Sequence, residues 1–188
     1  MMYHRRLPHE RETTRPVFLT WCLFDSLPSH RTFPEGEVSS GRAFAIMDRL
    51  LDEADTGSFY LRQPLVADMV VEAIHYNATT LGQYGLHAFV VMPNHVHLLI
   101  TPRIELPRIT KSLKGITAKR ANEMLWLTGT KFWQEESYDH TVRNEQSFGR
   151  IWSYIEQNPV RAGLVRRPEQ YRWSSAGWLQ ERTRKNQG

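Results

Sequence analysis

Apolar positions in the first half of the chain predict one strand followed by two helices. Residues 17–24 form an apolar run rich in strand formers, which predicts a buried strand. Apolar residues then recur at helical spacing over residues 42–54 and again over residues 63–81, so each segment is expected to form a helix with one apolar face. Between the strand and the first helix, residues 25–41 are rich in Pro, Gly and Ser, which favours a loop.

The centre of the chain predicts a β-hairpin followed by a long helix. Residues 86–91 and 95–101 are apolar segments of strand length, and Pro93 and Asn94 lie between them. Pro presets its own φ angle and Asn tolerates a positive φ, so this pair suits the central positions of a tight turn. Apolar residues at approximately helical spacing over residues 106–127 predict the next helix.

The remaining part of the chain predicts a short strand and one further helix. Residues 132–134 and 139–142 are expected to form a short strand or a bulged hairpin. Asn144 is a favourable N-cap for a helix that extends to about Asn158. Pro159 disfavours helical geometry at the residue before it, so the helix is expected to end or kink there.

This order of elements predicts a single α+β domain. A strand, helices, a hairpin, a helix, a strand and a helix are typical of an antiparallel sheet with helices packed on one face, and a ferredoxin-like arrangement fits this order best. We expect the domain to span residues 16–165, after a flexible basic arm at residues 1–15 and before a basic tail at residues 166–188. The other face of such a sheet is available for a functional site.

Length, cysteine content and charge narrow the class of protein. The chain has 188 residues, of which 40% are hydrophobic, and this suits one domain with a proper core. Its longest apolar stretches are under about ten residues, too short for a membrane span, and no signal-peptide core follows the polar N-terminus. Cys22 is the single cysteine, so a disulfide framework is excluded and a cytoplasmic protein is expected. The formal charge of +4 permits a polyanionic partner.

Two histidines separated by one residue lie in the second strand of the predicted hairpin. Successive side chains of a strand point to opposite faces, so His95 and His97 share one face while Val96 points to the other. Two imidazoles held side by side on a rigid strand are a ready pair of metal ligands. The alternative is a half-buried strand whose outer face carries two histidines that bind nothing.

A tyrosine and an asparagine lie one turn apart on the helix predicted before Pro159. Tyr154 and Asn158 are four residues apart and are expected at the edge of the packed sheet. The Asn158 side-chain oxygen can complete a three-ligand site for Mg²⁺ or Mn²⁺ with His95 and His97. Tyr154 would then be the nucleophile that attacks a phosphodiester polarised by the ion. Alternatively, Tyr154 is a partly buried helix residue, and Asn158 caps a turn that begins at Pro159.

Basic residues gather in two segments, and both are expected to contact nucleic acid. Residues 103–120 carry six basic residues against one acidic residue, and residues 161–185 carry seven against two. Lys and Arg neutralise phosphates, and tryptophans stack on unpaired bases. The alternative is that the charges form solvated helix faces and that the tryptophans belong to the core. The candidate DNA-binding residues are Lys111, Lys114, Lys119, Arg120, Arg161 and Trp133.

Several segments, taken in order and at their spacing, resemble the REP-associated tyrosine transposases, members of the single-tyrosine HUH (His–hydrophobic–His) transposase superfamily. The matching segments are residues 92–99, residues 132–140, residues 154–165 and the Trp-Ser-Ser-Ala sequence at residues 173–176. The resemblance implies a ferredoxin-like HUH nuclease core that acts on single-stranded DNA. It also implies that His95, His97 and Asn158 bind the metal ion and that Tyr154 is the nucleophile. More distant insertion-sequence relatives often have Gln in the position of Asn158.

The resemblance also implies a reaction and a substrate. In this family the tyrosine attacks a phosphodiester, leaving a 5′-phosphotyrosine link and a free 3′-hydroxyl. The link conserves the bond energy, so another 3′-hydroxyl rejoins the strands without ATP. The substrates are short hairpin-forming repeats of bacterial chromosomes (repetitive extragenic palindromes), with a small unpaired tetranucleotide beside the stem.

Three hypotheses follow from these residues. The first is a metal-dependent endonuclease and strand transferase (a transposase) that acts on such repeats. This enzyme would be cytoplasmic and would associate with the nucleoid when it is bound to DNA. The second is a catalytically silent nucleic-acid-binding protein that regulates repeat elements; an inactive descendant is expected to have lost one of the four site residues, and all four are present. The third is a structural or hydrolytic zinc site that uses the two histidines with a carboxylate or a third histidine and assigns no role to Tyr154.

Three further features stay open at this point. His140 is a candidate to orient a metal ligand or a phosphate, and a purely structural histidine fits it as well. Residues 25–60 form a longer insertion than a minimal family member is expected to have. Both a monomer and a homodimer are compatible with the sequence.

Overall fold

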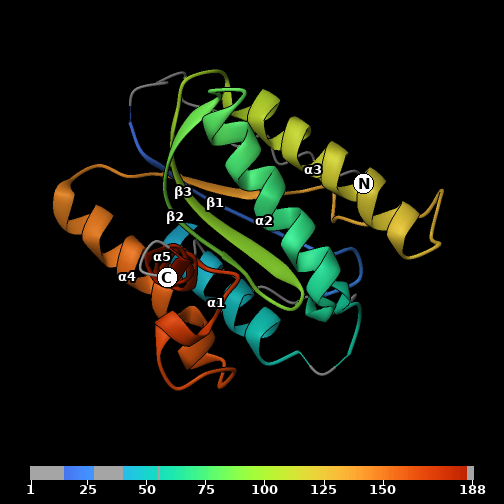
Figure 1. The fold of residues 1–188 in the computed structure, drawn as a ribbon. Coiled ribbons are helices and arrows are strands. Elements are labelled where there is room, and N and C mark those ends of the chain that lie inside the picture. The colour runs from blue at the N-terminus through green and yellow to red at the C-terminus, as the bar shows by residue number, and fades with distance from the viewer. Residues whose placement is uncertain (1–14, 28–39, 55, 186–188) are drawn as a thin grey trace.

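Four antiparallel strands, in the spatial order β2-β3-β1-β4, form the centre of the structure (Figure 1). The computed structural model describes residues 15–27, 40–54 and 56–185. This strand order, combined with the order of strands and helices along the chain, is the ferredoxin-like arrangement, so the predicted α+β fold is confirmed. The strands are β1 (Val17–Cys22), β2 (Tyr84–Val91), β3 (His95–Pro102) and β4 (Tyr138–Thr141).

The helices lie close to their predicted positions. In the described part of the chain, the α-helices are α1 (Ser40–Asp52), α2 (Pro64–Thr79), α3 (Leu106–Met124), α4 (Glu145–Arg161) and α5 (Ser175–Lys185). Within these residues no helix has both the length and the apolar character that a membrane crossing requires. The arm predicted at residues 1–15 and the loop predicted at residues 25–41 fall mostly outside the described residues.

The alternation of side chains along the strands gives the sheet two packed faces. On one face, Leu98 and Ile100 of β3 pack beneath α2 and α3. On the other face, Phe18 of β1 and Leu99 of β3 pack against Ile155 of α4. Figure 1 shows α2 and α3 on one side of the sheet and α1 and α4 on the other. Helices therefore cover both faces of the sheet, and not one face as the sequence predicts. The second face, which carries α1 and α4, is the face of the site.

Helix α4 continues past the position where the sequence predicts its end. The predicted end of the helix at Asn158 is wrong, because α4 contains Pro159 and ends at Arg161. The alternative, a kink at this position, stays a prediction. A proline removes one helical hydrogen bond, and here the following turn still forms, since the Ala162 N–H donates to the Asn158 carbonyl at 2.9 Å. Pro159 is itself buried, and this packing offsets part of the lost hydrogen bonding.

Residues 171–174 pack on the sheet, although they lie in the segment that the sequence predicts as a basic tail. Strand β2 is an edge strand, and its Val91 N–H donates to the Trp173 carbonyl at 2.8 Å. The hydroxyl of Tyr171, which is buried, donates to the Val91 carbonyl at 2.9 Å. The indole N–H of Trp173 donates to Asp68 of α2 at 2.8 Å. Backbone groups of an edge strand need partners, and residues 171–174 supply them.

Gly177, near the start of α5, packs directly against the backbone of Tyr171. A Cβ atom at this position would lie 2.1 Å from the Tyr171 carbonyl oxygen. We expect Gly177→Ala to lower the free energy of unfolding by about 1–3 kcal/mol, because the overlap forces the backbone apart. Gly115→Ala on α3 is the control, since a Cβ there meets nothing within 4 Å. Urea unfolding of both variants checks the prediction, and equal stabilities would contradict it.

Candidate active site

The two histidines of β3 lie together in a buried site beneath α1 and α4. His95 and His97 both have 0% of their surface exposed, and their ring centroids are 4.7 Å apart. The prediction that both imidazoles lie on one face of the sheet is confirmed, because the register pairs His97 with Thr20 and the ring stacks near Phe18 of the same face. The alternative of two histidines on an outer, half-buried face is wrong.

Hydrogen bonds fix the proton of His95 on the nitrogen that faces away from the site. The Asn94 side-chain amide donates through Nδ2 to the Leu51 carbonyl at 2.9 Å, so its Oδ1 atom faces His95. An amide oxygen only accepts, and the His95 Nδ1 atom lies 2.7 Å from it, so Nδ1 carries the proton. The Nε2 atom of His95 therefore presents a lone pair to the site. Backbone and amide partners commonly orient metal-binding histidines in this way.

His97 is oriented by a neighbouring strand and by α4. Its Nδ1 atom lies 2.7 Å from the Thr20 hydroxyl of β1. Its Nε2 atom lies 3.2 Å from the Nδ2 atom of Asn158, so in this arrangement Nε2 accepts from the amide and Nδ1 donates to Thr20. Asn158 is fully buried, and its side chain does not cap the turn at Pro159, contrary to the capping alternative.

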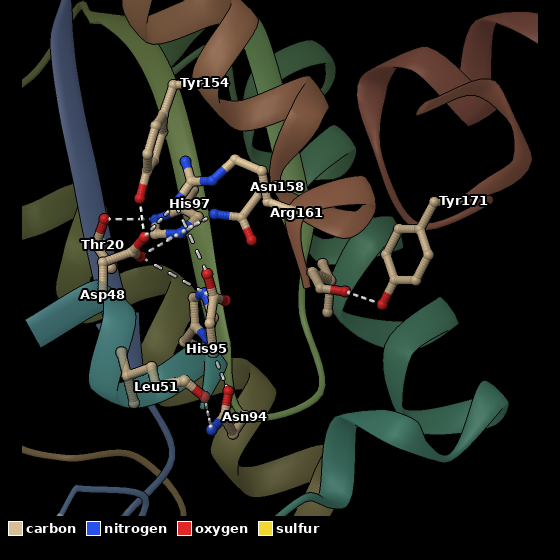
Figure 2. A network of polar contacts seen from close by, with 12 residues as sticks. Thr20, Asp48, Leu51, Asn94, His95, His97, Tyr154, Asn158, Arg161 and Tyr171 are labelled. Atoms are coloured by element: carbon tan, nitrogen blue, oxygen red, sulfur yellow. Dashed lines mark hydrogen bonds and ion pairs between the residues drawn. The ribbon is translucent and has the colours of Figure 1, made fainter. Parts of the chain in front are cut away.

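Tyr154 reaches the same point from one turn earlier on α4 (Figure 2). Its ring lies 5.8 Å from the His97 ring, and its hydroxyl donates a hydrogen bond to the Oδ2 atom of Asp48. The four site residues predicted from the sequence are thus brought together by β3 and α4. The hydroxyl is held beside the histidines and does not point to solvent.

Two carboxylates of α1 complete the site, and the sequence analysis missed both. Asp48 is 1% exposed, and its Oδ1 atom lies 3.0 Å from His97 Nε2 and 3.9 Å from His95 Nε2. Asp52 follows one turn later, with its Oδ1 atom 3.9 Å from His95 Nε2. One ligand atom from each of Asp48, His95 and His97 lies within 4.8 Å of the others. The available signal was a pair of acidic residues at i, i+4 on a helix predicted to have an apolar face.

The ionisation of these groups follows from burial and from their mutual contacts. Burial lowers the pKa of His95 to about 3, with His97 adding to the effect, so His95 is neutral at pH 7. Burial alone would raise the pKa of Asp48, but His97 above all, and then His95 and Arg161, lower it overall. Burial and the neighbouring Asp48 raise the pKa of Asp52 to about 6. At neutral pH the site therefore combines a neutral imidazole with an ionised carboxylate.

Several buried polar atoms of the site have no hydrogen-bond partner among the described residues. They are Asp48 Oδ1, Asp52 Oδ1, His95 Nε2 and Asn158 Oδ1. Leaving such atoms unsatisfied costs about 1–3 kcal/mol each, and native proteins rarely do so without a reason. All of them are electron-pair donors, and imidazole nitrogen with carboxylate and amide oxygen is a donor set that suits Mg²⁺ or Mn²⁺. The residues present therefore fit a divalent cation.

Arg161 lies at the exposed rim of this site. Its guanidinium carbon is 4.6 Å from the centroid of the Tyr154 ring, and Nη2 is 3.7 Å from Asp48 Oδ2 and 3.8 Å from Asp52 Oδ2. The side chain is 46% exposed, so it connects the buried carboxylates to the surface. Of the predicted DNA-binding residues, Arg161 is the one that the structure places beside Tyr154 and Asp48.

The other predicted DNA-binding residues lie on the opposite side of the sheet, on or beside α3. The prediction that Trp133 stacks on a base is wrong, because Trp133 is 6% exposed and its indole N–H donates to Thr117 at 2.9 Å. Lys114 donates to the carbonyls of Gln134 and Glu135 at 2.7 and 2.8 Å, so its ammonium group fastens the loop after α3. Lys111, Lys119 and Arg120 are exposed.

His140 lies on the same face of the sheet as the site. The register pairs His140 of β4 with Phe18 of β1, and Phe18 stacks on the His97 ring with centroids 5.5 Å apart. Paired residues of neighbouring strands point to the same face, so one phenylalanine separates the two histidines. A role for His140 in orienting a ligand stays a prediction.

The hydroxyl of Thr20 offers a direct test of how His97 is oriented. We expect Thr20→Val to weaken Mn²⁺ binding by about 10–100-fold, because valine keeps the shape but leaves the His97 Nδ1 proton without an acceptor. Thr101→Val is the matched control, since the Thr101 hydroxyl lies 2.7 Å from His87, a histidine outside the site. Titration calorimetry measures both affinities. Equal affinities for the two variants would contradict this account of the hydrogen bond.

Comparison with known proteins places this geometry in a family. The model of the family described as "Transposase IS200 like" matches residues 60–158, more than half of the chain, including both histidines, Tyr154 and Asn158. The chain belongs to the IS200-like transposase family. The predicted class, a DNA-nicking and strand-transfer enzyme, is confirmed at the level of the family. The alternative, a catalytically silent binding protein, is not favoured. The matched residues leave out α1.

Individual relatives agree with this assignment. The ISDra2 transposase TnpA of Deinococcus radiodurans is 33% identical over 108 residues, covering 52% of this chain and 75% of that protein. A REP-associated tyrosine transposase of Escherichia coli K12 is 26% identical over 93 residues, covering 49% of this chain and 54% of that protein. The fold is similar to a solved REP-associated tyrosine transposase bound to a REP hairpin, with a TM-score of 0.56 and 18% identity over 93% of this chain and 82% of the other.

Proposed function

We propose that this transposase cuts and rejoins single-stranded DNA at hairpin-forming repeats, with Tyr154 as the nucleophile. The observation that carries the proposal is the meeting of the Tyr154 hydroxyl with the buried pair His95 and His97 at one point, in a chain of this family. A zinc site without a role for Tyr154 does not account for the hydrogen bond between this hydroxyl and the carboxylate that faces the histidines.

The chain's own residues account for the main steps. The Tyr154 oxygen bonds to the phosphorus of a phosphodiester, the bond from phosphorus to the 3′-oxygen breaks, and the strand keeps a free 3′-hydroxyl and a 5′-phosphotyrosine link. The Tyr154 hydroxyl donates its hydrogen bond to Asp48 Oδ2, so this carboxylate is placed to take the proton as the new bond forms, and the departing 3′-oxygen takes a proton from solvent. His95, His97 and the Asn158 oxygen would hold Mg²⁺ or Mn²⁺, which supplies Lewis-acid polarisation of the phosphodiester. The reverse attack by a 3′-hydroxyl reseals a strand and releases Tyr154.

Arg161 is the residue that we propose to contact the DNA backbone at the reacting phosphate. Its guanidinium group stacks on the nucleophile's ring and is partly exposed, so it can exchange its carboxylate partners for phosphate oxygens. Lys111, Lys119 and Arg120 on α3 are proposed to contact DNA farther from the site, on the other side of the sheet.

The proposed substrate is a DNA hairpin of the repetitive extragenic palindrome type with a single-stranded flank. Support comes from the named E. coli relative and from the solved relative bound to a REP hairpin. We propose that the protein acts in the cytoplasm, on the nucleoid, as a monomer or a homodimer. The basic arm at residues 1–15 is proposed as an additional DNA contact.

Incubation of the full-length protein with labelled oligonucleotides tests this function. The set contains hairpin repeats from the source genome with their single-stranded flanks, the same repeats fully paired with a complement, and scrambled sequences, each with Mn²⁺, Mg²⁺, Zn²⁺ or EDTA. We expect a protease-sensitive adduct with the hairpin substrate in Mn²⁺ or Mg²⁺ and none in EDTA. Retarded but uncleaved DNA under every condition would favour the binding protein instead.

A further inference from the structure

Helix α1 brings a carboxylate to the histidine pair from outside the part of the chain that matches the family. The match begins at residue 60, whereas α1 ends at Asp52. Asp48 of α1 is nonetheless buried in the centre of the site, with 1% of its surface exposed. Burying an ionised carboxylate costs free energy unless it is paired or binds a cation. The position of Asp48 therefore needs an explanation that the family match does not supply.

The two oxygen atoms of Asp48 face different partners (Figure 2). Oδ1 faces the Nε2 atoms of His97 and His95, at 3.0 and 3.9 Å, and makes no aligned hydrogen bond with any described residue. Oδ2 accepts the hydrogen bond from the Tyr154 hydroxyl and faces Arg161 at 3.7 Å. The partners of Oδ2 are thus a donor and a cation, whereas Oδ1 faces the imidazole nitrogens of His95 and His97. Carboxylate oxygen and imidazole nitrogen are ligand atoms of divalent cations, and one such atom from each of Asp48, His95 and His97 lies within 4.8 Å of the others.

The position of α1 is tied to the orientation of His95. The Leu51 carbonyl of α1 accepts the hydrogen bond from Asn94, and the other end of the same amide faces the His95 Nδ1 atom. The Leu51 side chain is itself 2% exposed, so this turn of α1 is packed into the protein. The side chain of Asn94 therefore does two things: it orients the His95 ring, and it holds α1, the helix that carries Asp48, in position.

We propose that Asp48 is an additional, anionic ligand of the divalent ion through Oδ1, and that its Oδ2 holds the Tyr154 hydroxyl beside that ion. This inference rests on the proposed function. Without Asp48, the proposed ligands are two imidazoles and an amide, which leave the charge of the ion uncompensated; a carboxylate is the ligand that Mg²⁺ and Mn²⁺ favour. Helix α1 is then part of the metal centre, which gives a role to the part of the insertion that forms this helix.

Calorimetric titration of full-length protein with Mn²⁺ tests the assignment. We expect Asp48→Asn, which keeps the shape but removes the charge, to weaken Mn²⁺ binding by at least about tenfold, in the range seen when groups around a metal are altered. Glu53→Gln is the matched control, because it removes one charge just after the end of α1, at an exposed position paired with Arg49. An affinity within about threefold of the control would overturn the assignment, since even the groups that only orient a metal ligand typically change the affinity by about tenfold or more.

A second measurement uses the unaltered protein and does not depend on the folding of a variant. Anomalous X-ray scattering from crystals soaked in Mn²⁺ locates the ion. We expect the Asp48 Oδ1 atom at roughly 2.1 Å from it, a bonding distance for small hard cations. An ion bound by the histidines with Asp48 outside bonding distance would overturn the assignment and leave the proposed function standing. Weakened Mn²⁺ binding in Asp48→Asn, with no DNA adduct from the unaltered protein, would support the ligand and overturn the function.

Discussion

Replacing Tyr154 by Phe is expected to reduce covalent adduct formation and strand cleavage by at least about a thousandfold, because it removes the nucleophile itself. The aromatic ring remains in place between His97 and Arg161, so the fold and the packing of α4 should be retained. DNA binding is expected to change little, since the basic residues are untouched. Denaturing gel electrophoresis measures the adduct, and a band-shift titration of the same hairpin measures binding.

Tyr76→Phe serves as the control for the loss of a hydroxyl. Tyr76 is 53% exposed on α2, on the face of the sheet opposite the site, so this variant should form the adduct at the normal rate. Adduct formation by Tyr154→Phe at a rate similar to that of Tyr76→Phe would mean that another residue attacks the DNA.

Replacing His97 by Gln is expected to weaken Mn²⁺ binding by at least about a hundredfold, more than the change expected for groups that only orient a ligand. Cleavage should fall in parallel, because the phosphodiester is then no longer polarised. Glutamine preserves much of the volume, which limits the effect on the buried packing around Phe18. Titration calorimetry with Mn²⁺ gives the affinity, and the adduct assay gives the activity.

His87→Gln is the matched control for this substitution. His87 lies on β2, 2.7 Å from the Thr101 hydroxyl, outside the group of residues that face the proposed ion. Circular dichroism of both variants checks that they are folded. Unchanged Mn²⁺ binding in a folded His97→Gln protein would show that the ion binds elsewhere or not at all.

Much of the fold could be predicted because local patterns determine it. Strands β1, β2 and β3 and the turn at Pro93 and Asn94 follow from apolar runs of strand length and from the φ preferences of two residues. The shared face of His95 and His97 follows from the two-residue period of a strand, and the shared side of Tyr154 and Asn158 from the period of a helix.

The missed features depend on contacts between segments far apart in the sequence. Asp48 lies on α1, and the spacing of apolar residues in α1 predicts that the helix has an apolar face. This spacing does not predict which part of the protein the helix packs against. Trp133 is predicted to stack on an unpaired base, but it is buried beside Thr117, in a position that only the packed sheet defines. Tyr171 lies in a basic segment, yet it is buried, because its hydroxyl donates to the Val91 carbonyl at the edge of β2. Helical spacing predicts faces, and tertiary packing decides what each face meets.

The most direct test of the central claim is to identify the residue that carries the DNA. The protein is incubated with Mn²⁺ and a hairpin oligonucleotide labelled at its 3′ end, and a denaturing gel shows whether the label migrates with the protein. The adduct is then digested with nuclease and trypsin before mass spectrometry. We predict that the label stays with the protein and that a nucleotide phosphate modifies the tryptic peptide 151–161, in which Tyr154 is the single tyrosine. Modification of a different residue, or a product with a free 5′-phosphate and no adduct, would contradict the proposed mechanism.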